Sequence, residues 1–134
     1  MTAPYLVPAP ARLGRQTAAL HAAATLLEWL GHLGVLNIAV HADYAPGLPV
    51  EVDAQIGMVT EDDDEQGDQV RLDRLNAISV LLGLPIRRTW TSGSMHAFAL
   101  PRFDVDTVPV HLWTAFTTPD VITRADALTT EVRR

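Results

Sequence analysis

Cysteine and lysine are both absent from this chain of 134 residues, and aromatic residues make up only 6% of it. Without cysteine the chain has no disulfide bonds, no thiolate ligands for zinc and no thiol nucleophile, so redox and thiol-based catalytic roles are excluded. Without lysine, all ten basic residues are arginines. The fold therefore depends on packing, hydrogen bonds and ion pairs of arginine or histidine.

Long apolar runs and targeting signals are also missing. No run of apolar residues approaches the roughly 20 that cross a bilayer. The N-terminal stretch M-T-A-P-Y-L-V-P-A-P lacks the basic region and apolar core of a secretory signal. Neither a phosphate-binding loop nor G-x-G-x-x-G is present, which argues against the familiar kinds of nucleotide binding. We therefore predict a cytoplasmic protein that does not act at membranes.

Acidic residues outnumber basic ones, and the formal net charge is −6 at pH 7. Nonspecific nucleic-acid binding needs many basic groups to neutralise phosphates, so this balance argues against a nucleic-acid partner. The acids are concentrated, because ten of them lie between Asp43 and Asp73, a stretch with a single base, Arg71. With 48% hydrophobic and 19% charged residues, the composition and length predict one globular domain.

The first half of the chain predicts one helix and one hairpin. Residues 1–11 are rich in proline and predict an extended arm. A helix is expected from 12 to 33, with Gly34 as its C-terminal cap. Its apolar stripe would consist of Leu13, Leu20, Ala24, Leu27 and Leu30. Strands at 35–43 and 50–57 follow and are expected to pair in an antiparallel hairpin.

Alternation along these two strands sorts their side chains onto two faces. The apolar face would carry Ile38, Val40, Val50, Val52 and Ile56. The polar face would carry Asn37, His41, Asp43, Glu51, Asp53 and Gln55.

The second half predicts another helix and three more strands. The helix runs from about Glu65 to Leu82, and Gly83 ends it. Its apolar stripe would consist of Leu75, Ile78, Leu81 and Leu82. Two strands, at 87–91 and 95–100, would be joined by the Ser-Gly-Ser turn, whose serines lack the G-x-S-x-G frame of a nucleophile. A last strand is expected at 108–117, before a C-terminal tail at 119–134 that would be either a short helix or frayed.

Together these elements predict the order α-β-β-α-β-β-β within one domain at 12–118. The domain would divide into an αββ unit at 12–58 and an αβββ unit at 62–118. The predicted fold class is α+β, a two-layer sandwich with two helices on one face of a roughly five-stranded antiparallel sheet. The other face of the sheet would be uncovered.

The stretch T-E-D-D-D-E-Q-G-D at 60–68 holds six acids in nine positions. Gly67 fits the calcium-loop pattern D-x-[DN]-x-[DN]-G-x5-E, but Gln66 and Asp73 replace ligands of the pattern, whose second half overlaps the predicted helix. Acids at a helix start accept its free N–H groups and favour the positive end of its dipole. We therefore favour helix capping, with a weak cation site and an acidic partner-binding patch as alternatives.

Three polar residues of the first helix, His21, Glu28 and His32, share a stripe. Glu28 and His32 could share a metal ion at i and i+4, but His21 lies too far along the helix to be the third ligand. The simpler interpretation is the solvent-exposed face of an amphipathic helix. We predict no metal site, no other cofactor and no catalytic residue.

The best candidate surface for binding combines polar residues from both halves of the sheet. If the faces coincide, it contains His41, Asp43, Glu51, Asp53, His96, His111 and Trp113. The neighbouring carboxylates repel one another unless a cation or an arginine approaches. Candidate partners on neighbouring strands are Arg87, Arg88 and Arg102. Such a surface could be an oligomer or partner interface, a solvated face, or a small-ligand or acid–base site, and we favour the interface.

The chain resembles a group of small, uncharacterised actinobacterial α+β proteins that are often encoded near mobile or phage-like elements. The shared features are a helix closing on Leu-Gly, the acidic run at 62–64, a helix from Val70 that ends on L-G-L-P at Pro85, and V-P-V-x-L at 108–112. The resemblance implies an α+β fold and brings no established activity. No site residue is therefore carried over from it.

These observations lead us to expect a non-enzymatic protein-interaction module. It would form a homodimer through the open face of the sheet, and it could also bind another protein. The first alternative is a small enzyme or ligand-binding protein that uses the histidines and carboxylates of the sheet. The second is an acidic protein that mimics DNA through residues 43–73.

Overall fold

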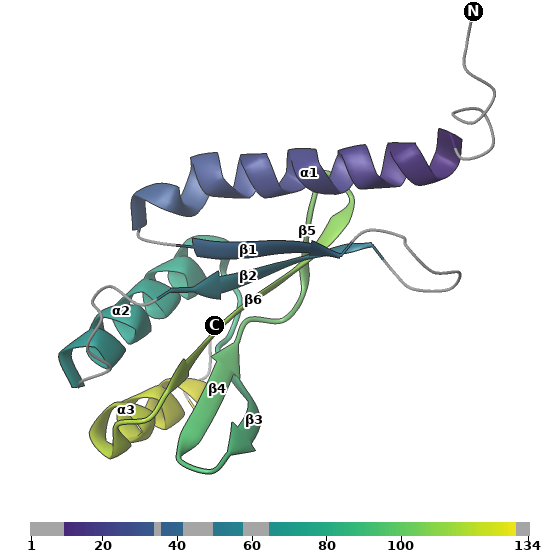
Figure 1. Ribbon diagram of the computed structural model, residues 1–134. Helices are drawn as coiled ribbons and strands as arrows, with labels where there is room; N and C mark the ends of the chain where they lie inside the picture. Colours follow the sequence, from purple (N-terminus) through teal and green to yellow (C-terminus); the bar gives the residue numbers. More distant parts are fainter. Residues whose placement is uncertain (1–9, 34–35, 42–49, 58–64, 131–134) are drawn as a thin grey trace, which may run out of the picture.

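The computed structural model describes residues 10–33, 36–41, 50–57 and 65–130, which form an α+β fold as predicted (Figure 1). The helices are α1 (Pro10–Leu30), α2 (Glu65–Leu82) and α3 (Pro119–Thr130), and a short 3-10 helix, η2 (Gly31–Leu33), follows α1. The strands are β1 (Leu36–His41), β2 (Glu51–Ile56), β3 (Arg87–Ser92), β4 (Met95–Ala99), β5 (Phe103–Val105) and β6 (Val108–Phe116). Within the described ranges, no helix combines the length and apolar character that spanning a bilayer requires.

The strands form one open sheet in the order β1-β2-β6-β4-β3, with β5 alongside β6. β1 and β2 make the predicted antiparallel hairpin, with His41 opposite Glu51. β2 and β6 are parallel, with Asp53 opposite His111, and the remaining pairs are antiparallel. The predicted five-stranded antiparallel sheet is therefore corrected to a mixed sheet of six strands.

β6 lies at the centre of the sheet although it is the last strand in the sequence. Its residues alternate between buried and half-buried along its whole length. It pairs with β2 along one edge and with β4 and β5 along the other, so both edges of its backbone have hydrogen-bonding partners. Because β2 and β6 are far apart in the sequence, their parallel pairing depends on long-range packing rather than on a turn.

The turn between β5 and β6 holds Asp106 and Thr107 at φ angles of 49° and 70°. Both angles lie in the left-handed region, which costs a non-glycine residue roughly 1–2 kcal/mol and suits β-branched side chains least. We expect Thr107→Gly to raise the free energy of unfolding by up to about 1 kcal/mol, because relief of the left-handed strain exceeds the entropic cost of ordering a glycine. Urea denaturation measures this change. Thr91→Gly, in strand β3, should instead lower the free energy of unfolding.

All three helices pack against the same face of the sheet, and their buried side chains join those of the strands in one core. Among the described residues, no helix lies over the opposite face (Figure 1). The largest fully buried side chains come from every layer of the core: Leu26 and Leu30 of α1, Leu75 and Ile78 of α2, Val121 of α3, Val52 and Ile56 of β2, Phe98 of β4, and Val110, Leu112 and Phe116 of β6.

α3 lies in the segment that was predicted to be a tail outside the domain, either a short helix or frayed, and it is a third helix beside the two assigned to the domain. Val121 and Ala125 are fully buried, and Arg88 of β3 holds Asp126 through bonds of 3.1 and 2.6 Å. Pro119 occupies the first helical position, where its missing N–H leaves no hydrogen bond unmade. The C-terminal helix is therefore part of the core.

α1 buries a different stripe from the predicted one. Ala19, Ala22, Ala23, Leu26 and Leu30 are buried. Leu20 is 61% exposed and Leu27 is 46% exposed, and Ala24 is also exposed, so these three residues of the predicted stripe face solvent whereas Leu30 is buried. Both stripes have helical spacing, so periodicity alone does not choose between them. The small alanines of the buried stripe allow the helix backbone to approach the sheet closely, which favours the observed orientation.

The C-terminus of α2 follows the prediction. Gly83 has a φ angle of 68°, and its N–H donates to the carbonyl of Val80 at 3.3 Å. The N–H of Leu84 donates to the carbonyl of Ser79 at 3.1 Å. These two bonds form a Schellman motif, in which glycine takes the left-handed position without a steric cost.

The first turns of α2 contain Asp68, which is fully buried. Its Oδ2 accepts the N–H groups of Thr117 at 3.0 Å and Thr118 at 2.8 Å, and its Oδ1 accepts a hydrogen bond from Arg71. Asp68 therefore caps the junction of β6 and α3, not the start of its own helix. Residues 62–64 lie outside the described ranges. Because α2 is helical from Glu65 onward, the second half of the calcium-loop pattern is helix, as expected.

Candidate functional site

The sheet face that the helices leave uncovered carries every second side chain of its strands. On β6 these side chains are half-buried, whereas the alternate ones are fully buried in the core. The same alternation holds along β2. We call this surface the open face. From β1 to β4 it consists of Asn37, Ala39, His41, Glu51, Asp53, Gln55, Pro109, His111, Trp113, Ala115, Met95, Ala97 and Ala99.

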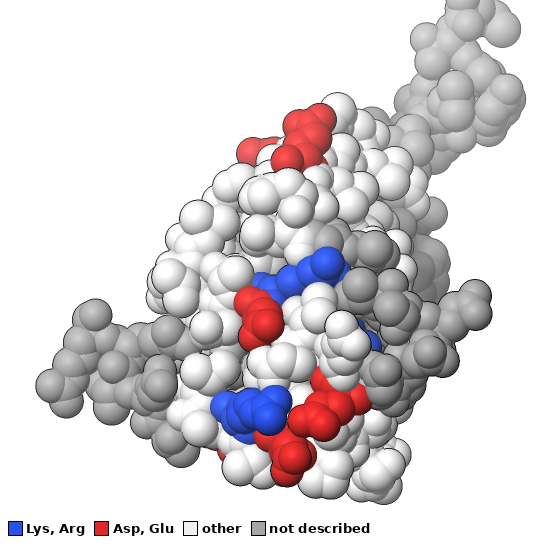
Figure 2. Space-filling model, turned by 90° about the vertical axis from the view of Figure 1, so that its left-hand side faces the viewer, with Lys and Arg blue, Asp and Glu red and all other residues white. Residues whose placement is uncertain are grey.

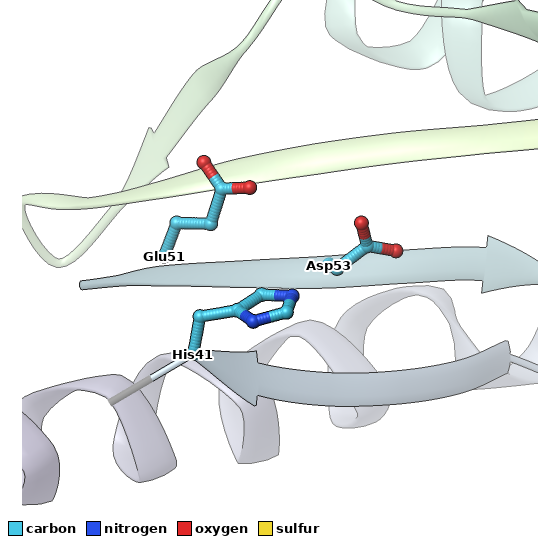
Figure 3. A group of neighbouring side chains, drawn as sticks. All are labelled: His41, Glu51 and Asp53. Carbon is cyan, nitrogen blue, oxygen red and sulfur yellow. The ribbon is translucent and has the colours of Figure 1, made fainter. Parts of the chain in front are cut away.

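Three side chains converge where β1 and β2 lie side by side. His41 and Glu51 are direct partners across the two strands, and Asp53 is two residues further along β2. All three project from the same side of the hairpin (Figure 3). One nitrogen or oxygen atom of each lies within 4.8 Å of those of the other two. We call these three residues the His–carboxylate cluster.

Neighbouring residues hold the two carboxylates of this cluster. Arg102 donates its Nε–H to Oε2 of Glu51 at 3.1 Å. Trp113 donates its indole N–H to Oδ1 of Asp53 at 2.8 Å. The second oxygen of Asp53 lies 3.4 Å from Nδ1 of His111, whose ring stacks on Trp113 with centroids 6.4 Å apart. The carboxylates therefore have defined directions, and one expected arginine partner, Arg102, is confirmed.

The aromatic part of the open face is built around Trp90 and Trp113, whose ring centroids are 5.9 Å apart. Trp90 is 42% exposed and Met95 is 40% exposed. The register of β3 against β4 shifts between Arg88 and Thr91, so Thr89 and Trp90 together oppose Ala97. This is a β-bulge, and it accounts for the position of the Trp90 ring beside Trp113 on the open face.

Charges of opposite sign lie toward opposite edges of the open face. Glu51 and Asp53 belong to β2, next to the edge strand β1. Arg87 belongs to the other edge strand, β3, and pairs with Ala99, which in turn pairs with Trp113. Arg87 is therefore on the open face, and its side chain is exposed. Trp113 of β6 lies between these two edges, and Trp90, on the same edge strand as Arg87, contacts it.

The structure brings together most of the residues that the sequence analysis assigned to one surface: His41, Glu51, Asp53, His111 and Trp113. Asp43 lies outside the described residues. His96 pairs with Phe116 and therefore projects from the helix-covered side, where its Nδ1 lies 3.5 Å from the hydroxyl of Thr91. A shift of one residue moves a side chain to the other face, and the sequence contains no indication of the β4–β6 register.

Two large residues of the aromatic part of the open face, Trp90 and Met95, were not singled out in the sequence. Trp90 belongs to the predicted strand R-R-T-W-T, but simple alternation places it on the same face as Arg88. Only the bulge reverses this assignment, and no local sequence pattern marks the bulge. Arg88, a second expected partner for the carboxylates, instead pairs with Asp126 of α3.

The remaining candidates have ordinary structural surroundings. His21, Glu28 and His32 are all exposed, and the described part of the chain has no group of three metal-type ligands on α1 or η2. Gly93, with a φ angle of 59°, forms the hairpin turn between β3 and β4. The Ser-Gly-Ser stretch is therefore a turn, as predicted.

A small pocket opens beside Trp113 at one end of the open face. Its volume is about 100 Å³, and its lining includes Gln55, Arg71 and Met95. Pockets that enclose a drug-sized ligand usually have roughly 300–1,000 Å³. The open face is therefore better suited to a broad contact than to enclosing an organic molecule.

The fold and site define an α+β protein with an open mixed sheet, helices on one of its faces, and aromatic and charged residues on the other. No family model, curated protein or solved structure matches the chain. The resemblance to small actinobacterial α+β proteins stays a prediction, and the geometry of the open face is the basis for inferring a function.

Proposed function

We propose that this protein is a non-enzymatic interaction module that forms a homodimer through the open face. The observation that carries this proposal is the Trp90–Trp113 pair with the exposed Met95, on the sheet face over which none of the described helices lies. Exposed aromatic and methionine side chains, surrounded by polar groups, are enriched at protein interfaces. Tryptophan in particular supplies much of the binding energy at such surfaces. A cytoplasmic location remains a prediction.

The arrangement of charges favours a second copy of the chain as the partner. Two copies can stack face to face about a two-fold axis parallel to the strands, as in aligned sheet packing. β2 of one copy then lies toward β3 of the other, so Asp53 approaches Arg87 of the second copy, and the tryptophans meet at the centre. An axis perpendicular to the strands would instead place carboxylates opposite carboxylates, which is unfavourable.

We expect Trp90→Ala to weaken dimerisation by about 30-fold or more, the effect of losing an interfacial hot spot. Sedimentation-equilibrium measurements of the wild type and the variant give both dissociation constants. Trp29→Ala is a matched control, because Trp29 is exposed to a similar extent, 44% against 42%, but belongs to α1. A wild-type protein that stays monomeric at high micromolar concentration would contradict the homodimer.

A charge exchange tests the orientation of the two copies. We expect Arg87→Glu and Asp53→Lys each to weaken self-association, because each places like charges in both symmetry-related contacts. An equimolar mixture of the two variants should associate, since every contact in the mixed dimer again joins opposite charges. Native mass spectrometry distinguishes the mixed dimer by mass. Equal association of all species would show that these charges do not lie across the interface.

The acidic DNA-mimic alternative finds less support among the described residues. Such a protein needs a continuous acidic surface. On the face in Figure 2, acidic and basic side chains lie beside one another. Arg124 contacts Glu65 at 3.5 Å, and Arg88 contacts Asp126 at 2.6 Å. Residues 61–64, the most acidic part of the chain, lie outside the described ranges.

A further inference from the structure

The His–carboxylate cluster has the composition of a metal site that uses oxygen and nitrogen ligands. Glu51 and Asp53 supply carboxylate oxygens, His41 supplies an imidazole nitrogen, and one atom of each lies within 4.8 Å of the others. Side by side on one face of the sheet, the two carboxylates repel each other. We propose that these three residues bind one divalent transition-metal ion, for which Zn²⁺ is the probe.

The donor atoms favour a transition metal over magnesium or calcium. Mg²⁺ and Ca²⁺ prefer shells made of oxygen atoms, whereas an imidazole nitrogen suits Zn²⁺, Ni²⁺, Cu²⁺ or Fe²⁺. Two carboxylates also balance the double charge of such an ion. Three protein ligands leave a fourth position for water, as in open zinc sites.

Small movements of two side chains would bring the cluster to metal-binding geometry. With zinc–ligand bonds of about 2.1 Å, the ligand atoms of a tetrahedral site are roughly 3.4 Å apart. His41 is exposed at the end of β1, so its ring can rotate freely toward the carboxylates. Glu51 has a long side chain that can adjust once Arg102, bonded to it at 3.1 Å, moves away, while Asp53 is held by Trp113 at 2.8 Å. The site therefore has one fixed ligand and two adjustable ones.

The groups around the carboxylates resemble the outer shell of a metal site. Ligating carboxylates usually accept hydrogen bonds that fix their orientation, and loss of such a partner typically weakens metal binding about 10–100-fold. Trp113 and His111 would be such outer-shell partners of Asp53, because each contacts one of its carboxylate oxygens. Arg102 bonds Oε2 of Glu51 among the described residues, and its side chain is 61% exposed. It can therefore move away when a cation takes its place.

This inference does not depend on the proposed homodimer. In the face-to-face dimer, Arg87 of the second copy and a metal ion would compete for the same carboxylates. Metal binding is therefore best measured on the Arg87→Glu variant as well as on the wild type. Loss of dimerisation in this variant leaves the metal ligands intact, so the two proposals can fail separately.

The test is isothermal titration of untagged, metal-free protein with Zn²⁺. We expect one ion per chain, and at least about tenfold weaker binding for His41→Ala and for Glu51→Gln, since each removes a ligand. His96→Ala is the matched control, because His96 is also a strand residue but projects from the other side of the sheet. Co²⁺ should give the visible absorption of a low-symmetry site in the wild type and lose it in His41→Ala.

Two results would overturn the metal site. One is the absence of saturable Zn²⁺ binding to the wild type and to Arg87→Glu. The other is Zn²⁺ binding that His41→Ala and Glu51→Gln leave unchanged, which would place the ion elsewhere. Because His41 is exposed and Glu51 lies at the start of β2, neither change should impair folding, and circular dichroism would verify this.

Discussion

Asp68→Ala should lower the free energy of unfolding by about 3–5 kcal/mol, the usual cost of removing one partner of a buried ion pair. Asp68 is fully buried, and its carboxylate accepts the N–H groups of Thr117 and Thr118 and a bond from Arg71. Alanine removes all three bonds at once and takes the counter-charge from a guanidinium that is itself only 4% exposed. Against a typical domain stability of about 5–15 kcal/mol, this is a large loss.

Urea denaturation followed by circular dichroism would measure this effect. Asp73→Ala is the matched control, because Asp73 belongs to the same helix but is exposed, and its carboxylate accepts a hydrogen bond from Gln69 at 2.8 Å at the surface. We expect that change to cost no more than about 0.5 kcal/mol. The loss of unfolding free energy for Asp68→Asn should lie between those for Asp68→Ala and Asp73→Ala, since asparagine keeps an acceptor oxygen but loses the charge. Equal losses for Asp68→Ala and Asp73→Ala would mean that the junction of β6 and α3 does not depend on Asp68.

Leu26→Ala should destabilise the protein by about 2–5 kcal/mol, because it creates a cavity in the core. Leu26 is fully buried, whereas its neighbour Leu27 is 46% exposed. Leu27→Ala removes the same atoms from a site where much of their surface already contacts water. Alanine also has the higher helix propensity. We expect Leu27→Ala to cost less than about 1 kcal/mol.

The two leucine variants compare adjacent positions of one helix with the same chemical change, so thermal or urea unfolding of both gives a direct answer. A larger loss for Leu27→Ala than for Leu26→Ala would mean that α1 faces the sheet through the stripe predicted from the sequence. The observed orientation of α1 would then be wrong.

Local chemistry accounts for the parts of the fold that the sequence predicted. The hairpin of β1 and β2 follows from two short alternating strands separated by a turn, and alternation then places His41, Glu51 and Asp53 on one face. Gly83 ends α2 because a left-handed residue is needed there and glycine adopts it without strain. Both features depend on neighbours in the sequence.

Long-range pairing accounts for most of what the sequence did not predict. The parallel contact of β2 and β6 joins residues far apart in the chain, and it is this contact that brings His111 and Trp113 to Asp53. The bulge in β3 brings Trp90 to the open face, and the β4–β6 register places His96 on the opposite side. None of these depends on a local pattern that could be recognised in one sequence.

The sequence alone determined the α+β class, the ends of α2 and the polar face of the first hairpin, because propensity, capping and alternation act over a few residues. The tertiary structure decided which stripe of α1 is buried, because two stripes have helical spacing and only packing against the sheet distinguishes them. It also decided the role of Asp68. Its partners Thr117 and Thr118 directly follow β6, the last strand in the sequence. An acid near a helix start is expected to cap that helix. The carboxylate of Asp68 is instead buried against the end of β6, where it accepts the N–H groups that follow this strand.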